Sequence, residues 1–257
     1  MPSNDTRKRP TMDIVDARVA VGLATKQTYS ENVFLFVPNL IGYSRIILAA
    51  FSLHYMSYHP KYCTVLYSIS CLLDAVDGHA ARALGQSSKF GAVLDMVTDR
   101  CTTSCLLCYL TLAYPEWALG FQFLITLDFS SHYMHMNSSL VTGSKSHKQV
   151  DGDVSNLLRW YYNPTVLFIV CAGNELFYIA LYLMKWVHTP LSQSFGITAE
   201  LATQCTWAHV LLAISAPVWL LKNALNLVQL WKASKVLVGV DLAERAQARA
   251  AAAAKKS

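Results

Sequence analysis

Long apolar segments separated by short polar breaks fill most of the chain after residue 37. The segments cover residues 38–57, 62–83, 89–113, 116–137, 164–187 and 204–231. Each is about long enough to cross the hydrocarbon core of a bilayer, which takes roughly 20 residues of helix. Strands are not expected, because apolar and polar positions do not alternate and open sheets cannot span lipid. The pattern predicts an all-α, polytopic membrane protein with six transmembrane helices.

The two ends of the chain differ from this apolar region. Residues 1–30 are polar and carry the basic cluster Arg7-Lys8-Arg9, which indicates a cytosolic N-terminal extension. Residues 31–231 would then form the membrane domain. Residues 232–257 are rich in Ala, Lys and Arg, and they predict an exposed basic helix or tail.

The composition agrees with a membrane protein. Of the 257 residues, 54% are hydrophobic and only 14% are charged. An average soluble domain carries roughly 25% charged residues and about 45–50% apolar ones. The chain departs from both averages in the direction of a membrane protein.

Basic residues are distributed unevenly between the two sides that six spans would create. Of the 21 Lys and Arg residues, 16 fall in the termini and in or beside the two loops that share their side, with Arg82 and Lys89 counted at the segment ends that border the first of these loops. The opposite side has only Lys61 and Lys185, the latter at the end of the fifth segment, and Arg45, Arg100 and Lys222 fall in the interior of segments. By the positive-inside rule, both termini and the loops after the second and fourth spans are expected in the cytosol.

Four aspartates stand at helical spacing in two neighbouring segments. Asp74 and Asp77 are three residues apart, and Asp95 and Asp99 are four apart. Each pair therefore lies on one face of its helix. The short turn at residues 85–88 makes the two helices antiparallel neighbours, so we expect the two acidic faces to meet.

Charged groups at bilayer depth cost free energy, roughly 2.5–3.5 kcal/mol each on insertion scales. A divalent cation offsets this cost, and carboxylate oxygens suit Mg²⁺ or Mn²⁺. Magnesium commonly joins a few carboxylates to substrate phosphates, and two ions can clamp a diphosphate. The alternative is an ion pathway or proton relay, since intramembrane acids also mark transporters.

The spacing of the acids also matches a family signature. It is Asp-x-x-Asp-Gly-x-x-Ala-Arg, eight further residues, and Gly-x-x-x-Asp-x-x-x-Asp. Every position is filled, by Asp74, Asp77, Gly78, Ala81, Arg82, Gly91, Asp95 and Asp99. The chain therefore resembles the CDP-alcohol phosphotransferase family. This resemblance implies a six-helix membrane fold, a homodimer, and transfer of a phosphate-linked group from a CDP-alcohol to a hydroxyl.

The resemblance also implies roles for individual residues. The metal ligands would be Asp74, Asp77, Asp95 and Asp99, holding Mg²⁺ or Mn²⁺, with two ions per site. Asp99 would in addition be the base that takes the proton of the acceptor. Gly78 and Arg82 would face the CDP part of the donor, and Ser88 is a weaker carry-over to the same site. Asn39, near the start of the first span, could reach the cytidine.

Flanking segments indicate one branch of the family. Residues 32–45, 78–84, 131–135, 143–148 and 171–178 are similar to the eukaryotic enzymes that make phosphatidylinositol. This similarity implies the substrates CDP-diacylglycerol and myo-inositol and a location in the endoplasmic reticulum membrane, with no nucleic acid partner. A sister enzyme using glycerol phosphate, serine, choline or ethanolamine as acceptor is the alternative.

Four other residues within or near spans have two interpretations. His132 and His135 could contact inositol hydroxyls, although a structural role is slightly favoured. Arg45 and Lys222 are charged residues in apolar surroundings, where a partner or water is expected. Either could hold the donor phosphate or an anionic lipid.

Overall fold

The computed structural model describes residues 32–142, 163–195 and 200–254, and every element within these ranges is helical. The long helices are α2 (Val37–Tyr55), α3 (Pro60–Ala83), α4 (Lys89–Ala113), α5 (Ala118–Val141), α7 (Pro164–Met184) and α10 (Trp207–Ala254). The short ones are η1 (Val33–Leu35), η2 (Pro115–Trp117), α8 (Leu191–Phe195) and α9 (Glu200–Gln204). The prediction of an all-α protein is confirmed for the described residues.

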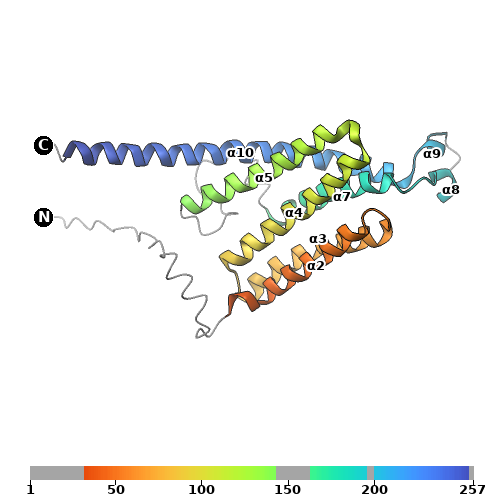
Figure 1. The fold of residues 1–257 in the computed structure, drawn as a ribbon, viewed down its shortest axis with the longest axis horizontal. Helices are drawn as coiled ribbons and strands as arrows, with labels where there is room; N and C mark the ends of the chain where they lie inside the picture. The colour runs from red at the N-terminus through yellow and green to blue at the C-terminus, as the bar shows by residue number, and fades with distance from the viewer. Residues whose placement is uncertain (1–31, 143–162, 196–199, 255–257) are drawn as a thin grey trace.

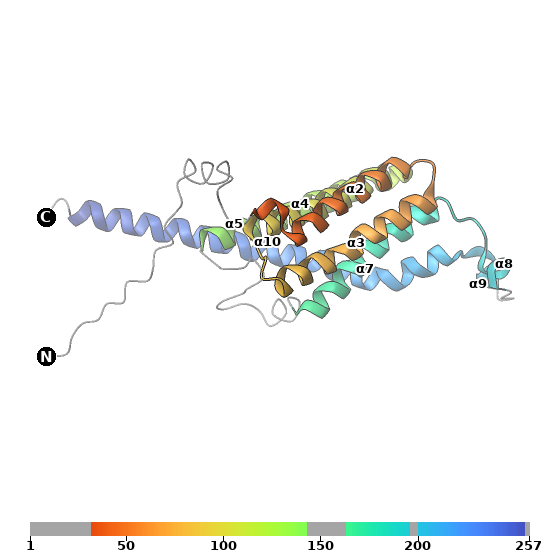
Figure 2. The same cartoon turned by 90° about the horizontal axis from the view of Figure 1, so that it is seen from below.

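The long helices run up and down in chain order (Figures 1 and 2). Helix α2 packs on α3 and α4, and α10 packs on α5 and α7. The turn between α3 and α4, the C-terminal end of α5 and the N-terminal end of α7 lie at one end of the bundle. The start of α2 lies at the same end, and α10 projects beyond it.

The predicted segments agree with the helices to within a few residues at most ends. The segment 89–113 coincides with α4. The last one is different, because α10 continues through residue 231 to Ala254, a length of roughly 70 Å at 1.5 Å per residue. The apolar pattern stops there, but Ala, Arg, Glu and Gln are strong helix formers and extend the helix. The predicted N-terminal extension lies outside the described residues.

Two of the described helices are long and apolar enough to cross a membrane, judged by length and composition. They are Thr165–Met184 and Trp207–Ala254. Helices α2 to α5 have a comparable length but carry buried polar and charged residues among the apolar ones, including Arg45, Asp77 and Thr102. Their crossing of the membrane therefore stays a prediction.

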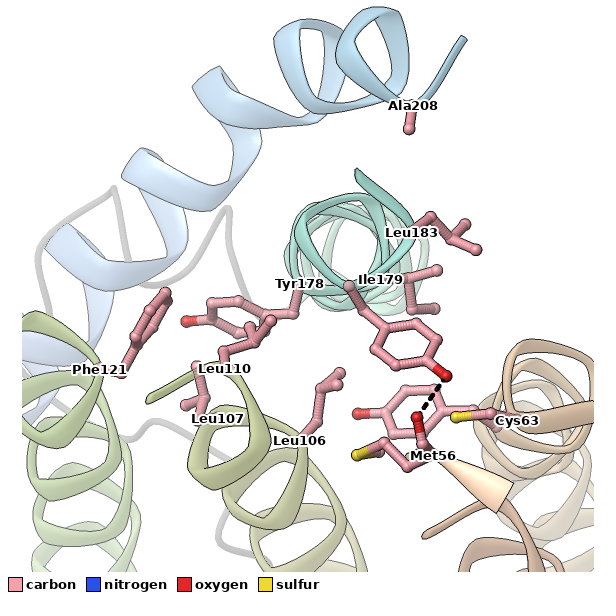
Figure 3. Close-up of a cluster of buried hydrophobic side chains, with 12 residues drawn as sticks. Met56, Cys63, Leu106, Leu107, Leu110, Phe121, Tyr178, Ile179, Leu183 and Ala208 are labelled. Carbon is pink, nitrogen blue, oxygen red and sulfur yellow. Dashed lines mark hydrogen bonds between the residues drawn. The ribbon is translucent and has the colours of Figure 1, made fainter. Parts of the chain in front are cut away.

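An apolar core joins α2, α3, α4 and α7 near the turn between α2 and α3 (Figure 3). Met56 and Cys63 flank this turn, and the Tyr182 hydroxyl donates a hydrogen bond of 2.8 Å to the Met56 carbonyl. The second half of α4 contributes Leu106, Leu107 and Leu110 to this core, and each of them is at most 2% exposed. This packing aligns α2 with α3 and α4, the two helices whose other halves carry the acidic motif.

Candidate metal centre

The acidic faces of α3 and α4 meet, as their spacing predicts. One carboxylate oxygen each from Asp74, Asp95 and Asp99 lies within 4.8 Å of the other two. Asp77 is outside this group of three and is the most buried of the four acids, at 8% exposure. The helices thus bring all four motif aspartates to one region, with three of them close enough to bind the same metal ion.

Local contacts around the turn between α3 and α4 set the geometry of these faces. Gly85 has a φ of +64°, a conformation that favours glycine and reverses the chain after α3. Ser88 is the N-cap of α4, and its hydroxyl accepts a hydrogen bond of 2.9 Å from the Gly91 amide. The Gln86 side chain accepts from the Val37 amide at 2.9 Å and ties the turn to α2. Ser88 therefore has a structural role, and its contact with a donor substrate stays a prediction.

Gly91 of the motif allows α2 to approach α4 closely. A Cβ atom at this position would lie 2.7 Å from the Oδ1 atom of Asn39, closer than side chains pack. Asn39 is 2% exposed, and its amide nitrogen donates to the Val33 carbonyl at 2.6 Å. The structure thus places Asn39 beside the motif, and its contact with the cytidine stays a prediction.

Gly78 and Arg82 lie one turn apart near the end of α3. A Cβ on Gly78 would be 3.6 Å from a terminal nitrogen of Arg82, and Arg82 is exposed. No other side chain comes within 4 Å of that Cβ position in the described part of the chain. Both residues therefore remain available for the donor role that the resemblance implies.

The centre of the acidic group is taken by Arg45 of α2. Its Nη1 atom lies 2.9 Å from an oxygen of each of three acids, and its Nη2 atom contacts the fourth, Asp99. The three are Asp74, Asp77 and Asp95. The sequence predicts that this buried charge has a partner or water nearby, but it does not indicate that the partners are the motif aspartates. The presence of Arg45 on the span next to the acidic ones could have indicated this pairing.

A second charged group lies next to the first, and we call it the Asp128 cluster. It comprises Arg100, Asp128, Lys222 and Asn226, from α4, α5 and α10. The Arg100 guanidinium contacts both oxygens of Asp128 at 2.7 Å and lies 3.6 Å from Asp99. Sequence reasoning noted the two cations but missed Asp128, although a single acid in an apolar run was a visible signal.

His132 lies at the edge of the Asp128 cluster. Its Nδ1 atom is 2.8 Å from the Asp128 carbonyl oxygen, one turn earlier on α5. The Ser131 hydroxyl is 3.2 Å from the same nitrogen. These contacts agree with the structural role that the sequence slightly favoured for His132.

The residues of the acidic group fit a divalent cation. The candidate ligand atoms are all carboxylate oxygens, the type that Mg²⁺ and Mn²⁺ prefer. Asp74, Asp95 and Asp99 are each about one-third exposed at the side chain, so the group is not sealed from a substrate. The arrangement can therefore hold an ion and present it to a phosphate.

A comparison with known proteins identifies the family. Residues 35–233 match the family model of CDP-alcohol phosphatidyltransferases. The chain belongs to this family. The match spans all the motif residues and every long helix of the bundle, except the last part of α10.

Several curated members of the family are similar to the chain over nearly their full length. The CDP-diacylglycerol–inositol 3-phosphatidyltransferase of Schizosaccharomyces pombe is 48% identical over 227 residues, which cover 85% of this chain and 95% of that protein. The proteins of the same name from Rattus norvegicus and Homo sapiens are 47% and 46% identical over 218 residues, covering 84% of this chain and 98% of each protein. No solved structure matches the chain significantly.

Proposed function

We propose that this chain transfers the phosphatidyl group of CDP-diacylglycerol to myo-inositol, giving phosphatidylinositol and CMP. The observation that carries the proposal is the meeting of Asp74, Asp95 and Asp99 in a chain that is 46–48% identical to enzymes named for this reaction. The acids supply the chemistry of the family, and the similarity to these relatives supports inositol as the acceptor.

Asp74, Asp77, Asp95 and Asp99 would hold Mg²⁺ or Mn²⁺, with two ions per site. Bound ions would stabilise negative charge on the attacking and leaving oxygens of the phosphoryl group. The four carboxylates come from two helices joined by a capped turn, so their relative positions are set before substrate arrives. Such preorganisation places charge where the reaction needs it.

Asp99 is the proposed base. It would accept the proton of an inositol hydroxyl while that oxygen bonds to the lipid-side phosphorus, and the bond from this phosphorus to the oxygen of CMP breaks. Its carboxylate lies in the first half of α4, 3.6 Å from a guanidinium nitrogen of Arg100, which is itself paired with Asp128. A base must lie within hydrogen-bond reach of the proton it takes, and the neighbouring Arg100 would help to orient the carboxylate for that purpose.

Gly78, Arg82, Ser88 and Asn39 are the proposed contacts to the CDP part of the donor. Arg82 is exposed beside Gly78, so its guanidinium is free to reach a diphosphate. Asn39 and Ser88 converge on Gly91, where a Cβ would lie 2.7 Å and 3.0 Å from their oxygens. These positions border the acids on the side of the turn between α3 and α4.

The proposal includes a six-span topology in the endoplasmic reticulum membrane, with both termini and the active site facing the cytosol, and a homodimer. The alternating helix directions support it, because the turn between α3 and α4, the end of α5 and the start of α7 lie at the same end of the bundle as the start of α2. Protease protection in microsomes tests the orientation. Light scattering of the purified protein in detergent tests the dimer.

A purified-protein assay tests the reaction. The protein is incubated with CDP-diacylglycerol, Mn²⁺ or Mg²⁺ and labelled inositol, and both CMP and labelled lipid are measured. Equal amounts of the two products are expected. Consumption of serine or glycerol phosphate in place of inositol would reject the acceptor, and absence of CMP with every acceptor would reject the transferase activity. Metal-driven ion flux in vesicles without CMP release would instead support a transporter.

A further inference from the structure

Arg45 lies in the middle of the carboxylates rather than at their edge. Its side chain is 2% exposed, and its Nη1 atom is at the same distance, 2.9 Å, from oxygens of Asp74, Asp77 and Asp95. These oxygens belong to two different helices, and the guanidinium comes from a third. The position between several carboxylates is the one that a bound cation takes.

The backbone of Arg45 is anchored, whereas its side chain is held by the acids. The Ser70 hydroxyl of α3 donates a hydrogen bond of 3.1 Å to the Arg45 carbonyl. The buried Nε atom has no hydrogen-bond partner among the described residues. Among the described residues, the guanidinium forms its hydrogen bonds and ion pairs with the four aspartates. Its place therefore depends on the negative charge of these acids.

A divalent ion and this guanidinium compete for the same oxygens. Asp74, Asp95 and Asp99 are the acids whose oxygens lie within 4.8 Å of one another, and each of the three contacts Arg45. Two cations that share ligands this closely repel each other strongly in a buried site. One must withdraw when the other binds, and the long flexible stem of Arg allows it to move.

We propose that Arg45 is a built-in counter-cation of the metal site, which holds the four carboxylates together when no divalent ion is bound and is displaced by the ion. The inference rests on the proposed metal-dependent function. Arg45 then has two effects. It stabilises the ion-free protein, and it weakens the binding of metal to the site. A purely structural arginine would stabilise both forms equally and would not weaken metal binding.

The first test compares stability with and without metal. Wild type, Arg45→Gln and the control Lys222→Gln are purified in Mn²⁺, and thermal unfolding is measured in EDTA and in saturating Mn²⁺. Lys222 is equally buried but pairs with Asp128, not with the four acids. Arg45→Gln should lower the midpoint by roughly 5–10 °C in EDTA and by much less in Mn²⁺. The control should lose the same amount in both.

An equal loss for Arg45→Gln in both conditions would overturn the proposal, and so would failure of this variant to fold even in Mn²⁺. Unfolding of the variant only after metal removal would support it. Because the readout is unfolding, these outcomes do not depend on whether the acceptor is inositol.

The second test measures metal affinity. Free Mn²⁺ is followed by electron paramagnetic resonance during titration of each protein. Arg45→Gln should bind Mn²⁺ about 10-fold more tightly than wild type, within the usual range of coupling between two binding events. Arg45→Lys, which keeps the charge, should lie between the two. Unchanged or weaker binding by Arg45→Gln would reject the counter-cation role alone, whereas absence of Mn²⁺ binding in wild type would also reject the proposed metal site.

Discussion

The two halves of α2, α3 and α4 differ sharply. Toward the turn between α3 and α4, these helices carry Arg45 and the four aspartates, several of them partly exposed. Toward the turn between α2 and α3, the same helices carry the apolar core, with Leu110 and Tyr67 at 0% and 1% exposure. One set of helices thus combines a charged site with the packing that aligns it.

A polar layer separates the two regions. Glu175 of α7 accepts hydrogen bonds from Tyr67 at 2.6 Å and from Thr103 at 3.0 Å. It thereby ties α7 to both α3 and α4 just beyond the acids. The structure of the acidic half thus depends on the balance of its charges, and that of the apolar half on how well its side chains fill the space. Substitutions in the acidic half should therefore mainly lower activity, and substitutions in the apolar half should mainly lower the free energy of unfolding.

The strongest contrast is expected at the proposed base. Asp99→Asn keeps the size of the side chain but cannot take a proton, so turnover should fall by roughly 100- to 10,000-fold. Binding of the donor should survive, since the contacts to CDP come from other residues. Release of CMP and equilibrium binding of CDP-diacylglycerol are the measurements.

Asp241→Asn is the control for that variant, because Asp241 is exposed on the projecting part of α10. It should keep wild-type turnover. If Asp99→Asn retains a tenth of the activity or more, Asp99 is not the base, and the charged half acts through metal binding alone.

A change at Gly91 tests whether close packing matters within the charged half. Gly91→Ala would push a Cβ to 2.7 Å from Asn39, so Asn39 or α4 must shift. If Asn39 contacts the donor, the KM for CDP-diacylglycerol should rise by up to about 100-fold. Gly120→Ala is the matched control, because a Cβ there meets nothing within 4 Å. An unchanged KM would remove Asn39 from the donor site.

In the apolar half, Leu110→Ala should affect stability and spare the chemistry. The residue is 0% exposed, so its truncation leaves a cavity that costs about 2–5 kcal/mol in the free energy of unfolding. Turnover per folded molecule should stay within about twofold of wild type, which corresponds to about 0.4 kcal/mol in the barrier. Unfolding in detergent and the CMP assay together give both numbers.

Leu112→Ala, two residues further along α4, is the matched control because Leu112 is 79% exposed. It should lose much less stability than Leu110→Ala. Equal losses at the two positions would mean that the exposed face of α4 is covered by another part of the protein, such as a second copy of the chain.

The smallest effect is expected for Tyr182→Phe. It removes the hydrogen bond of 2.8 Å to the Met56 carbonyl without changing the ring. The free energy of unfolding should drop by about 0.5–1.5 kcal/mol, and turnover should not change. The exposed Tyr133→Phe serves as the control. A clear loss of turnover would show that the two halves are coupled through α7.

Much of the fold and the acids of the site could be predicted from the chain alone. The helix over residues 89–113 is visible as an apolar segment between Ser88 and Pro115, and it coincides with α4. The meeting of Asp74 with Asp95 and Asp99 followed from their spacing and the short turn. That α10 continues as one helix to Ala254 did not follow, because its last residues carry no apolar pattern and left both a helix and a tail open.

The sequence by itself determined which residues form helices and which acids share a helix face, because both follow from the local 3.6-residue period. Only the tertiary structure decided that Arg45 contacts all four acids, that Asn39 packs against Gly91, and that Arg100 pairs with Asp128. Each of these contacts joins different helices. The partners in such a contact depend on the rotation and crossing angles of the helices, which cannot be predicted from a local sequence pattern.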